Sequence, residues 1–229
     1  VIPFIFSNDE MAVFVLSNNR LDIFDSNGAS VQANITSNCN WTTAKLFELN
    51  YAQFGDTVFI AHRDNPTVKI VRSSATSFAA SIFAFEEDDT VTVNSINKTT
   101  QPFYKYAASA ITLTPNATTG NTVTITASAS TFVSGHNGTY LLIGGKQAKI
   151  VGFTNATTVT VTVLEALANT DAEADWAEQL ISAVHGFPQA VTFHDNRLWF
   201  AGIRDKPAGV IASQVGGYFN FDIGTGQAD

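Results

Sequence analysis

The side chains that could carry metal chemistry are few in this sequence, and they are scattered along it. The four histidines, His62, His136, His185 and His194, show neither HxH nor HxxxH spacing, so no zinc-ligand pattern is present. The acidic run at 86–89 (EEDD) could offer oxygen ligands to Ca²⁺, but it lacks the alternating ligands and the glycine of a calcium loop. We therefore expect no metal site, and we interpret the histidines as structural residues.

Motifs of nucleophilic or phosphate chemistry are not evident either. The sequence contains no GxSxG nucleophile elbow, and Gly144-Gly145-Lys146 lacks the rest of a phosphate-binding loop. The single cysteine, Cys39, cannot form a disulfide within the chain and is interpreted as a small buried residue. We expect no catalytic residues, no cofactor and no enzymatic activity.

Composition narrows the class of protein further. The chain has 229 residues, of which 45% are hydrophobic and 14% are charged, so it can bury a substantial core. Its net charge of −8 argues against binding to nucleic acid phosphates or to an anionic membrane. No apolar run approaches the roughly 18–20 residues of a membrane-spanning helix, so no membrane anchor is expected.

Short β-like runs separated by turn residues are the elements that must position these side chains. Apolar and β-branched residues are concentrated at 11–16, 20–24, 56–62 and 67–72, and again after 189, as in β-strands. One or two helical turns are expected at 42–49 (TTAKLFEL). The pattern predicts an all-β fold that is propeller- or sandwich-like.

A change in residue composition, toward alternating Thr and Val, indicates an inserted domain. Thr/Val alternation with regular turns predicts five short strands between about 107 and 165, and we place a small β-sandwich or barrel at 105–165. The outer β region then comprises 1–104 and 166–229, and it is expected to continue in a longer chain. The segment 170–183 (TDAEADWAEQLISA) fits either a helix, with a capping box at Thr170 and Glu173, or a loop and a strand.

Two segments, 46–72 and 186–221, carry a resemblance to a known family. An opening motif and a first strand pair comprise Ile2, Pro3, Phe4, Phe6, Ser7, Tyr51, Gln53, Asp56, His62 and Pro66. The more specific later motif comprises Gly186, Pro188, Val191, Phe193, His194, Arg197, Leu198, Trp199, Phe200, Ala201, Gly202, Pro207, Ser213, Gly217, Phe219 and Phe221. Together they resemble the N-terminal half of the tail nozzle proteins of short-tailed phages, also called tail tubular protein B-like or stabilisation proteins. One departure is Phe78, where the family is expected to carry Trp.

The resemblance implies a structural virion protein that forms part of the conduit for DNA ejection. It implies a sixfold ring of identical subunits, contacts with a portal-associated adaptor and with other tail proteins, and synthesis in the cytoplasm of a bacterial host. Passing DNA would be repelled rather than bound, and acidic residues would then face the channel. The acidic candidates for that wall are the run at 86–89 and the patch Asp171, Glu173 and Asp175.

Two alternatives from other classes remain. One is a carbohydrate-binding adhesin or receptor-binding domain of a virion, with a shallow aromatic groove formed by Trp41, Trp176 and Tyr218. The weaker one is a glycan-degrading enzyme.

The run TFHDNRLWFAG (192–202) makes a specific packing prediction. It predicts a strand, a tight turn at Asp195-Asn196 and a second strand. We expect Phe193, Leu198 and Phe200 in the core, and we expect Arg197 to be held by a buried or half-buried acceptor.

Overall fold

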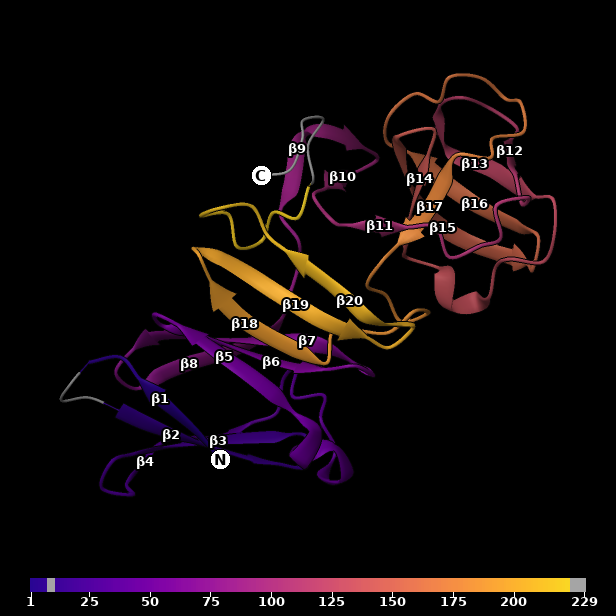
Figure 1. The fold of residues 1–229 in the computed structure, drawn as a ribbon. Helices are drawn as coiled ribbons and strands as arrows, with labels where there is room; N and C mark the ends of the chain where they lie inside the picture. The colour runs from indigo at the N-terminus through magenta and orange to yellow at the C-terminus, as the bar shows by residue number, and fades with distance from the viewer. Residues whose placement is uncertain (8–10, 223–229) are drawn as a thin grey trace. The chain divides into compact units, whose positions relative to one another are not determined.

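The computed structural model describes residues 1–7 and 11–222, and the regular secondary structure of these residues is almost entirely antiparallel β (Figure 1). The only helical elements in this part of the chain are two short 3-10 helices, η1 (Thr43–Glu48) and η2 (Ser134–His136). The predicted all-β fold is therefore confirmed, and the helical turns expected at 42–49 correspond to η1. No helix of the described ranges is long and apolar enough to cross a membrane.

The chain divides into two compact units. The first unit comprises Val1–Ala84 and His185–Tyr218, and the second comprises Phe85–Val184 and Phe219–Asp229. The insertion is thus larger than the predicted 105–165. Pairing of distant segments explains the difference, because β11 (Phe103–Tyr104) and β17 (Trp176–Gln179) pair with each other within the sheet of the second unit.

Three antiparallel meanders build the first unit. Each sheet is formed by strands that follow one another in the chain, as in the blades of a β-propeller. The first sheet contains β1 (Ile2–Ile5), β2 (Met11–Ser17), β3 (Arg20–Asp25) and β4 (Ser30–Ile35). The second contains β5 (Asn50–Phe54), β6 (Thr57–His62), β7 (Asn65–Ser74) and β8 (Ser77–Ile82). The third contains β18 (Ala190–His194), β19 (Arg197–Ile203) and β20 (Lys206–Ala212).

The second sheet lies between the other two because both of its faces are apolar. Val58 and Ile60 on β6 share a buried cluster with residues of the first sheet. Phe59, which points to the opposite face by strand alternation, lies with its ring centroid 5.6 Å from that of Phe193 on β18. Figure 1 shows the resulting stack of three sheets within this unit.

Aromatic side chains fill the core between the first and second sheets. The rings of Phe4 and Phe14 stack at 5.2 Å, and the ring of Phe78 meets both edge-on at 5.6 and 5.5 Å. Phe78 is only 4% exposed. The departure from the family pattern at this position is thus a core residue, where Phe supplies a large apolar surface without a polar group that needs a partner.

The β18–β19 hairpin follows the predicted strand, turn and strand. Asp195 and Asn196 both have positive φ, 47° and 56°, as a two-residue type I′ turn requires. Leu198 and Phe200 are fully buried, whereas Phe193 is only half-buried. The Arg197 guanidinium donates a hydrogen bond from Nη1 to the carbonyl oxygen of Ser213 at 2.9 Å, so the predicted acceptor is present.

A seven-stranded sheet forms most of the second unit, in the order β11–β17–β14–β15–β16–β13–β12. The strands predicted from Thr/Val alternation are β12 (Leu113–Pro115), β13 (Gly120–Ala127), β14 (Tyr140–Ile143), β15 (Lys146–Asn155) and β16 (Thr158–Val163). A separate hairpin consists of β9 (Glu87–Val93) and β10 (Ile96–Thr99).

The ends of this sheet approach each other, which gives it a barrel-like form. Leu113 on β12 and Glu173, just before β17, exchange both backbone hydrogen bonds, at 2.9 and 2.8 Å. The segment 170–183 therefore contains the strand β17 and no helix. Its Trp176 enters the core at 5% exposure, where burial within the sheet outweighs the local helical spacing.

Candidate functional site

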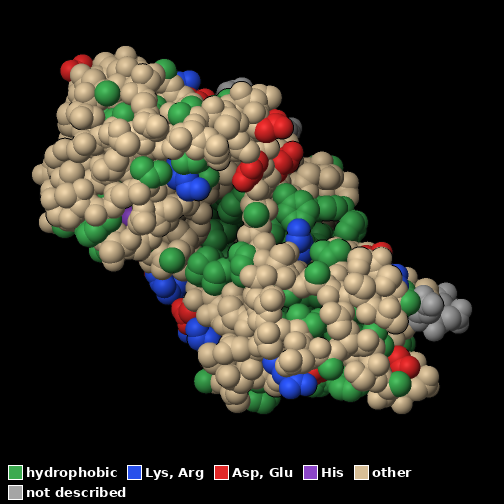
Figure 2. All heavy atoms as spheres, turned by 180° about the vertical axis from the view of Figure 1, so that it is seen from behind, with side chains coloured by type: hydrophobic (Ala, Val, Ile, Leu, Met, Phe, Trp, Pro, Cys, Tyr) green, Lys and Arg blue, Asp and Glu red, His purple; other side chains and the backbone are tan. Residues whose placement is uncertain are grey.

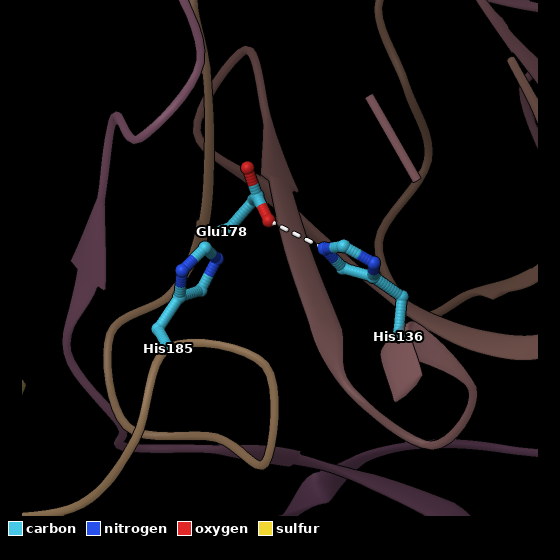
Figure 3. Close-up of side chains that lie close together, drawn as sticks. All are labelled: His136, Glu178 and His185. Carbon is cyan, nitrogen blue, oxygen red and sulfur yellow. Dashed lines mark hydrogen bonds and ion pairs between the residues drawn. The ribbon is translucent and has the colours of Figure 1, made fainter. Parts of the chain in front are cut away.

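Two of the four histidines are buried and hydrogen-bonded to carboxylates. His136 Nε2 lies 2.7 Å from Glu178 Oε2, and both side chains are buried (Figure 3). The backbone N–H of Val133 donates to His136 Nδ1 at 2.9 Å, which fixes the other edge of the ring. In the first unit, His62 Nε2 lies 3.2 Å from Glu48 Oε2. These contacts tie a 3-10 helix or a loop to a strand, which is a structural role.

The other two histidines also lie beside acidic residues of their own unit. His185 Nδ1 is 3.3 Å from Asp205 Oδ2, and Arg204 Nε is 2.9 Å from the other oxygen of the same carboxylate. The Arg204 hydrogen bond is the main reason that the pKa of Asp205 is lowered. The exposed His194 lies 3.2 Å from Asp195 in the β18–β19 turn.

The acidic run 86–89 leads into the β9–β10 hairpin rather than forming a ligand loop. Glu87 Oε2 accepts a hydrogen bond from Asn97 on the paired strand at 2.7 Å. Asp88 Oδ1 accepts from the Thr90 hydroxyl at 2.5 Å, and this bond is the main reason that the pKa of Asp88 is lowered. The carboxylates of Glu87 and Asp88 are thus hydrogen-bonded within the hairpin.

The prediction of an aromatic groove formed by Trp41, Trp176 and Tyr218 is wrong. Trp41 is fully buried in the first unit and donates from Nε1 to the carbonyl oxygen of Ser17 at 2.9 Å. Trp176 is buried in the second unit and donates to the carbonyl oxygen of Ile111 at 2.8 Å. Both indoles are core residues with satisfied N–H groups, so neither can offer its face to a sugar.

The outer face of the first sheet is a candidate association surface. Strand alternation directs Ala12 and Phe14 into the core, so the neighbouring residues of β2 point outward. The register aligns Pro3, Val13 and Phe24 in one row across three strands, and it places Ile5 opposite Met11. Ile5 is 56% exposed and Met11 45%. This outer face of the first sheet consists of Pro3, Ile5, Met11, Val13, Val15 and Phe24.

One charged pair borders that apolar face. Asp22 lies opposite Val15, and its carboxylate accepts hydrogen bonds from Arg20 Nη2 at 2.8 Å and from the backbone N–H of Asn34 at 2.7 Å. The bond from Arg20 is the main reason that the pKa of Asp22 is lowered. The charges therefore neutralise each other at the margin and leave the centre of the face apolar.

The third sheet presents a second outer face of the same kind. Its core residues are Leu198 and Phe200, and the alternate positions point away from the second sheet. The register aligns outward residues in two rows across β18, β19 and β20: Thr192, Trp199 and Ala212, and Ala190, Ala201 and Val210. At the turn end of the hairpin, the same face carries the polar pair His194 and Arg197. Val210 is 61% exposed. Small and apolar side chains make this face suitable for packing against another sheet.

The two faces lie at opposite ends of the three-sheet stack. The first sheet covers one face of the second sheet, and the third sheet covers the other. Figure 2 shows hydrophobic side chains at several places on the surface seen from behind. Contiguous exposed apolar patches mark interaction sites. The unbroken run MAVFVL at 11–16 shows in the sequence that strand β2 is apolar on both of its faces. The sequence alone does not say which of the two faces of β2 is exposed.

The chain matches no protein-family model, and no curated protein is significantly similar to it.

Proposed function

We propose that this chain is a structural virion protein, a subunit of the tail nozzle of a short-tailed phage that forms part of the DNA exit conduit. The observation that carries the proposal is the pair of open apolar faces at opposite ends of one stack of sheets. When two different faces of identical copies meet, the interface is heterologous, and repetition of such contacts closes into a ring or grows into a filament.

The positions of the family-like residues are consistent with this role. In the most specific stretch, Leu198 and Phe200 fill the core, and Arg197 clamps the chain at Ser213. Asp195 and Asn196, which lie within the same stretch, form the tight turn. The part of this stretch from Ala190 to Ala212 thus builds the third sheet, whose outer face is one of the two proposed contact surfaces.

The proposal includes the expected partners. Copies of the chain would form a ring, sixfold by the family resemblance, and the ring would contact a portal-associated adaptor and other tail proteins. The protein would be made in the cytoplasm of the bacterial host and carried in the virion. The net charge of −8 supports passage of DNA without specific binding, because like charges repel over about 8 Å at physiological salt.

Single charged substitutions test the two faces. Val13→Glu and Val210→Glu each place a charge on one outer face and should reduce the oligomer measured by light scattering after size exclusion. Val215→Glu is the matched control, because Val215 is 61% exposed like Val210 but lies outside the sheets. Equal loss of assembly in the control, or none in either variant, would contradict the proposal.

Mixing the two variants tests that unlike faces meet. A Val13→Glu copy retains the outer face of its third sheet, and a Val210→Glu copy retains that of its first sheet. The mixture should therefore form dimers but no larger species, because each pair leaves only the two blocked faces free. Pairing within either variant alone would instead indicate that like faces meet, and the heterologous ring would be refuted.

A further inference from the structure

A cleft of about 720 Å³ lies within the second unit, beside the edge strand β11. Its volume falls in the range of small-molecule sites. The lining is mostly apolar, with a few polar groups among aromatic rings. The residues that matter for recognition are Lys98, Thr99, Gln101, Phe103, Tyr104 and Glu165.

The wall that carries these residues is fixed by hydrogen bonds. The buried Gln147 side chain donates from Nε2 to the carbonyl oxygen of Thr99 at 2.7 Å, and its Oε1 accepts from the Thr99 backbone N–H at 3.1 Å. The carbonyl oxygen of Pro102 accepts from the backbone N–H of Leu180 at 2.9 Å. Pairing with β17 holds Phe103 and Tyr104. A wall held at several points loses little freedom when a ligand binds.

Two polar groups of this wall lack hydrogen-bond partners. Thr99 Oγ1 and Gln101 Nε2 are buried and unpaired, and their residues are only 8% and 4% exposed. Unpaired buried polar groups are rare in native proteins and call for an explanation, because each has lost its hydrogen bonds to water. A ligand oxygen that reached the Gln101 amide would restore one of those bonds.

The charges of the cleft argue for a neutral ligand. Lys98 Nζ lies 3.5 Å from Glu165 Oε1, and Lys105 Nζ lies 2.6 Å from Asp175 Oδ1. Each lysine is therefore neutralised by a carboxylate, and no excess of positive charge remains to select a phosphate or a sulfate. Tyr104, 40% exposed, supplies an aromatic surface beside these paired charges.

We propose that this cleft binds a neutral saccharide. A pyranose ring has an apolar C–H face that would pack on Tyr104, and its hydroxyl groups both donate and accept hydrogen bonds. One hydroxyl oxygen accepts from the Gln101 amide, and another pairs with the Thr99 hydroxyl. The cleft belongs to the second unit and the proposed contact faces belong to the first unit, so this proposal does not depend on the proposed ring assembly.

The test begins with the complete chain on an array of neutral, sialylated and sulfated oligosaccharides. Binding to at least one neutral glycan is expected, and binding confined to the anionic glycans would refute the proposal. Titration of the best neutral glycan is then repeated with Tyr104→Ala and with Gln101→Ala, each of which should bind at least about tenfold more weakly, a loss typical of one stacking or hydrogen-bonding contact. Tyr51→Ala is the matched control, because Tyr51 is 41% exposed but belongs to the first unit.

A measurement on the unaltered protein guards against variants that fail to fold. In ¹⁵N-labelled chain, addition of the same neutral glycan should shift the side-chain amide resonance of Gln101. An unchanged Gln101 resonance at saturating glycan would overturn the assignment. No neutral glycan binding at millimolar concentration, or equal weakening by Tyr51→Ala, would also overturn it.

Discussion

Replacing Phe200 by alanine should remove a large part of the stability of the first unit. The side chain is 1% exposed, and its ring meets that of Phe83 edge-on at 5.2 Å. Truncation of a fully buried Phe to Ala costs about 3–5 kcal/mol through lost transfer energy and the cavity that remains. The edge-to-face pair accounts for roughly 0.5–1.5 kcal/mol of that loss. Because whole domains are stable by only about 5–15 kcal/mol, the change is large.

Urea unfolding of the complete chain measures this loss. Circular dichroism follows the transition, and hydrogen exchange of the β18–β20 amides assigns the affected transition to the first unit, since the two units need not unfold together. The matched control is Phe47→Ala, because Phe47 on η1 is 100% exposed. That change should cost no more than about 0.5 kcal/mol. A loss below about 1 kcal/mol for Phe200→Ala, or equal losses for both variants, would refute the assignment of Phe200 to a packed core.

Three further predictions concern protonation and the bounds of the second unit. The pKa of Asp22 is held below its ordinary value mainly by Arg20. The Asp22 carboxylate therefore contributes fully to stability at pH values above the ordinary pKa, and this contribution is lost as the pH falls through the lowered pKa. Asp22→Asn should therefore unfold at lower urea near pH 7 and show a flatter loss of stability below about pH 4; an unchanged acid profile would contradict this. Burial raises the pKa of the Cys39 thiol to about 11, so a disulfide reagent at about pH 8 should label this thiol only after unfolding. The free energy of unfolding should also decrease as the pH rises from about 9 through 11, because the thiolate forms more readily in the unfolded chain. Rapid labelling of the native chain would be inconsistent with that burial. An excised 85–184 fragment should melt cooperatively, whereas 105–165 should not, because it lacks β11 and β17; equal melts would show that these strands are dispensable.

Local pattern was sufficient for the strands and for one hairpin. Alternation at 192–202 placed Leu198 and Phe200 on the buried face, and the Asp195-Asn196 pair marked the turn. These features are local because side-chain direction alternates along a strand and because positive φ favours Asn and Asp. In the structure, the same alternation along β3 buries Leu21 and Ile23 and places Phe24 on the outer face.

Where alternation and helical spacing competed, only the tertiary structure decided. The segment 170–183 has apolar residues at helical spacing, but Trp176 belongs to a strand that pairs with β14. The same pairing extends the second unit beyond the predicted 105–165, since β11 and β17 are more than 70 residues apart in the sequence. Long-range pairing of this kind has no local signature, because either strand would look the same with another partner.

The candidate surfaces depend on the same distinction. The sequence by itself determined that β2 is apolar on both faces, that the chain is acidic and that its histidines are scattered along the chain without metal-ligand spacing. Only the tertiary structure decided that one face of β2 is buried and the other is open, since this depends on where the second sheet packs. Likewise, Gln147 holds Thr99 from 48 residues away, while the buried amide nitrogen of Gln101 is left without a hydrogen-bond partner. Burial and hydrogen-bond satisfaction are properties of the packed chain, so they follow from tertiary contacts rather than from residue type.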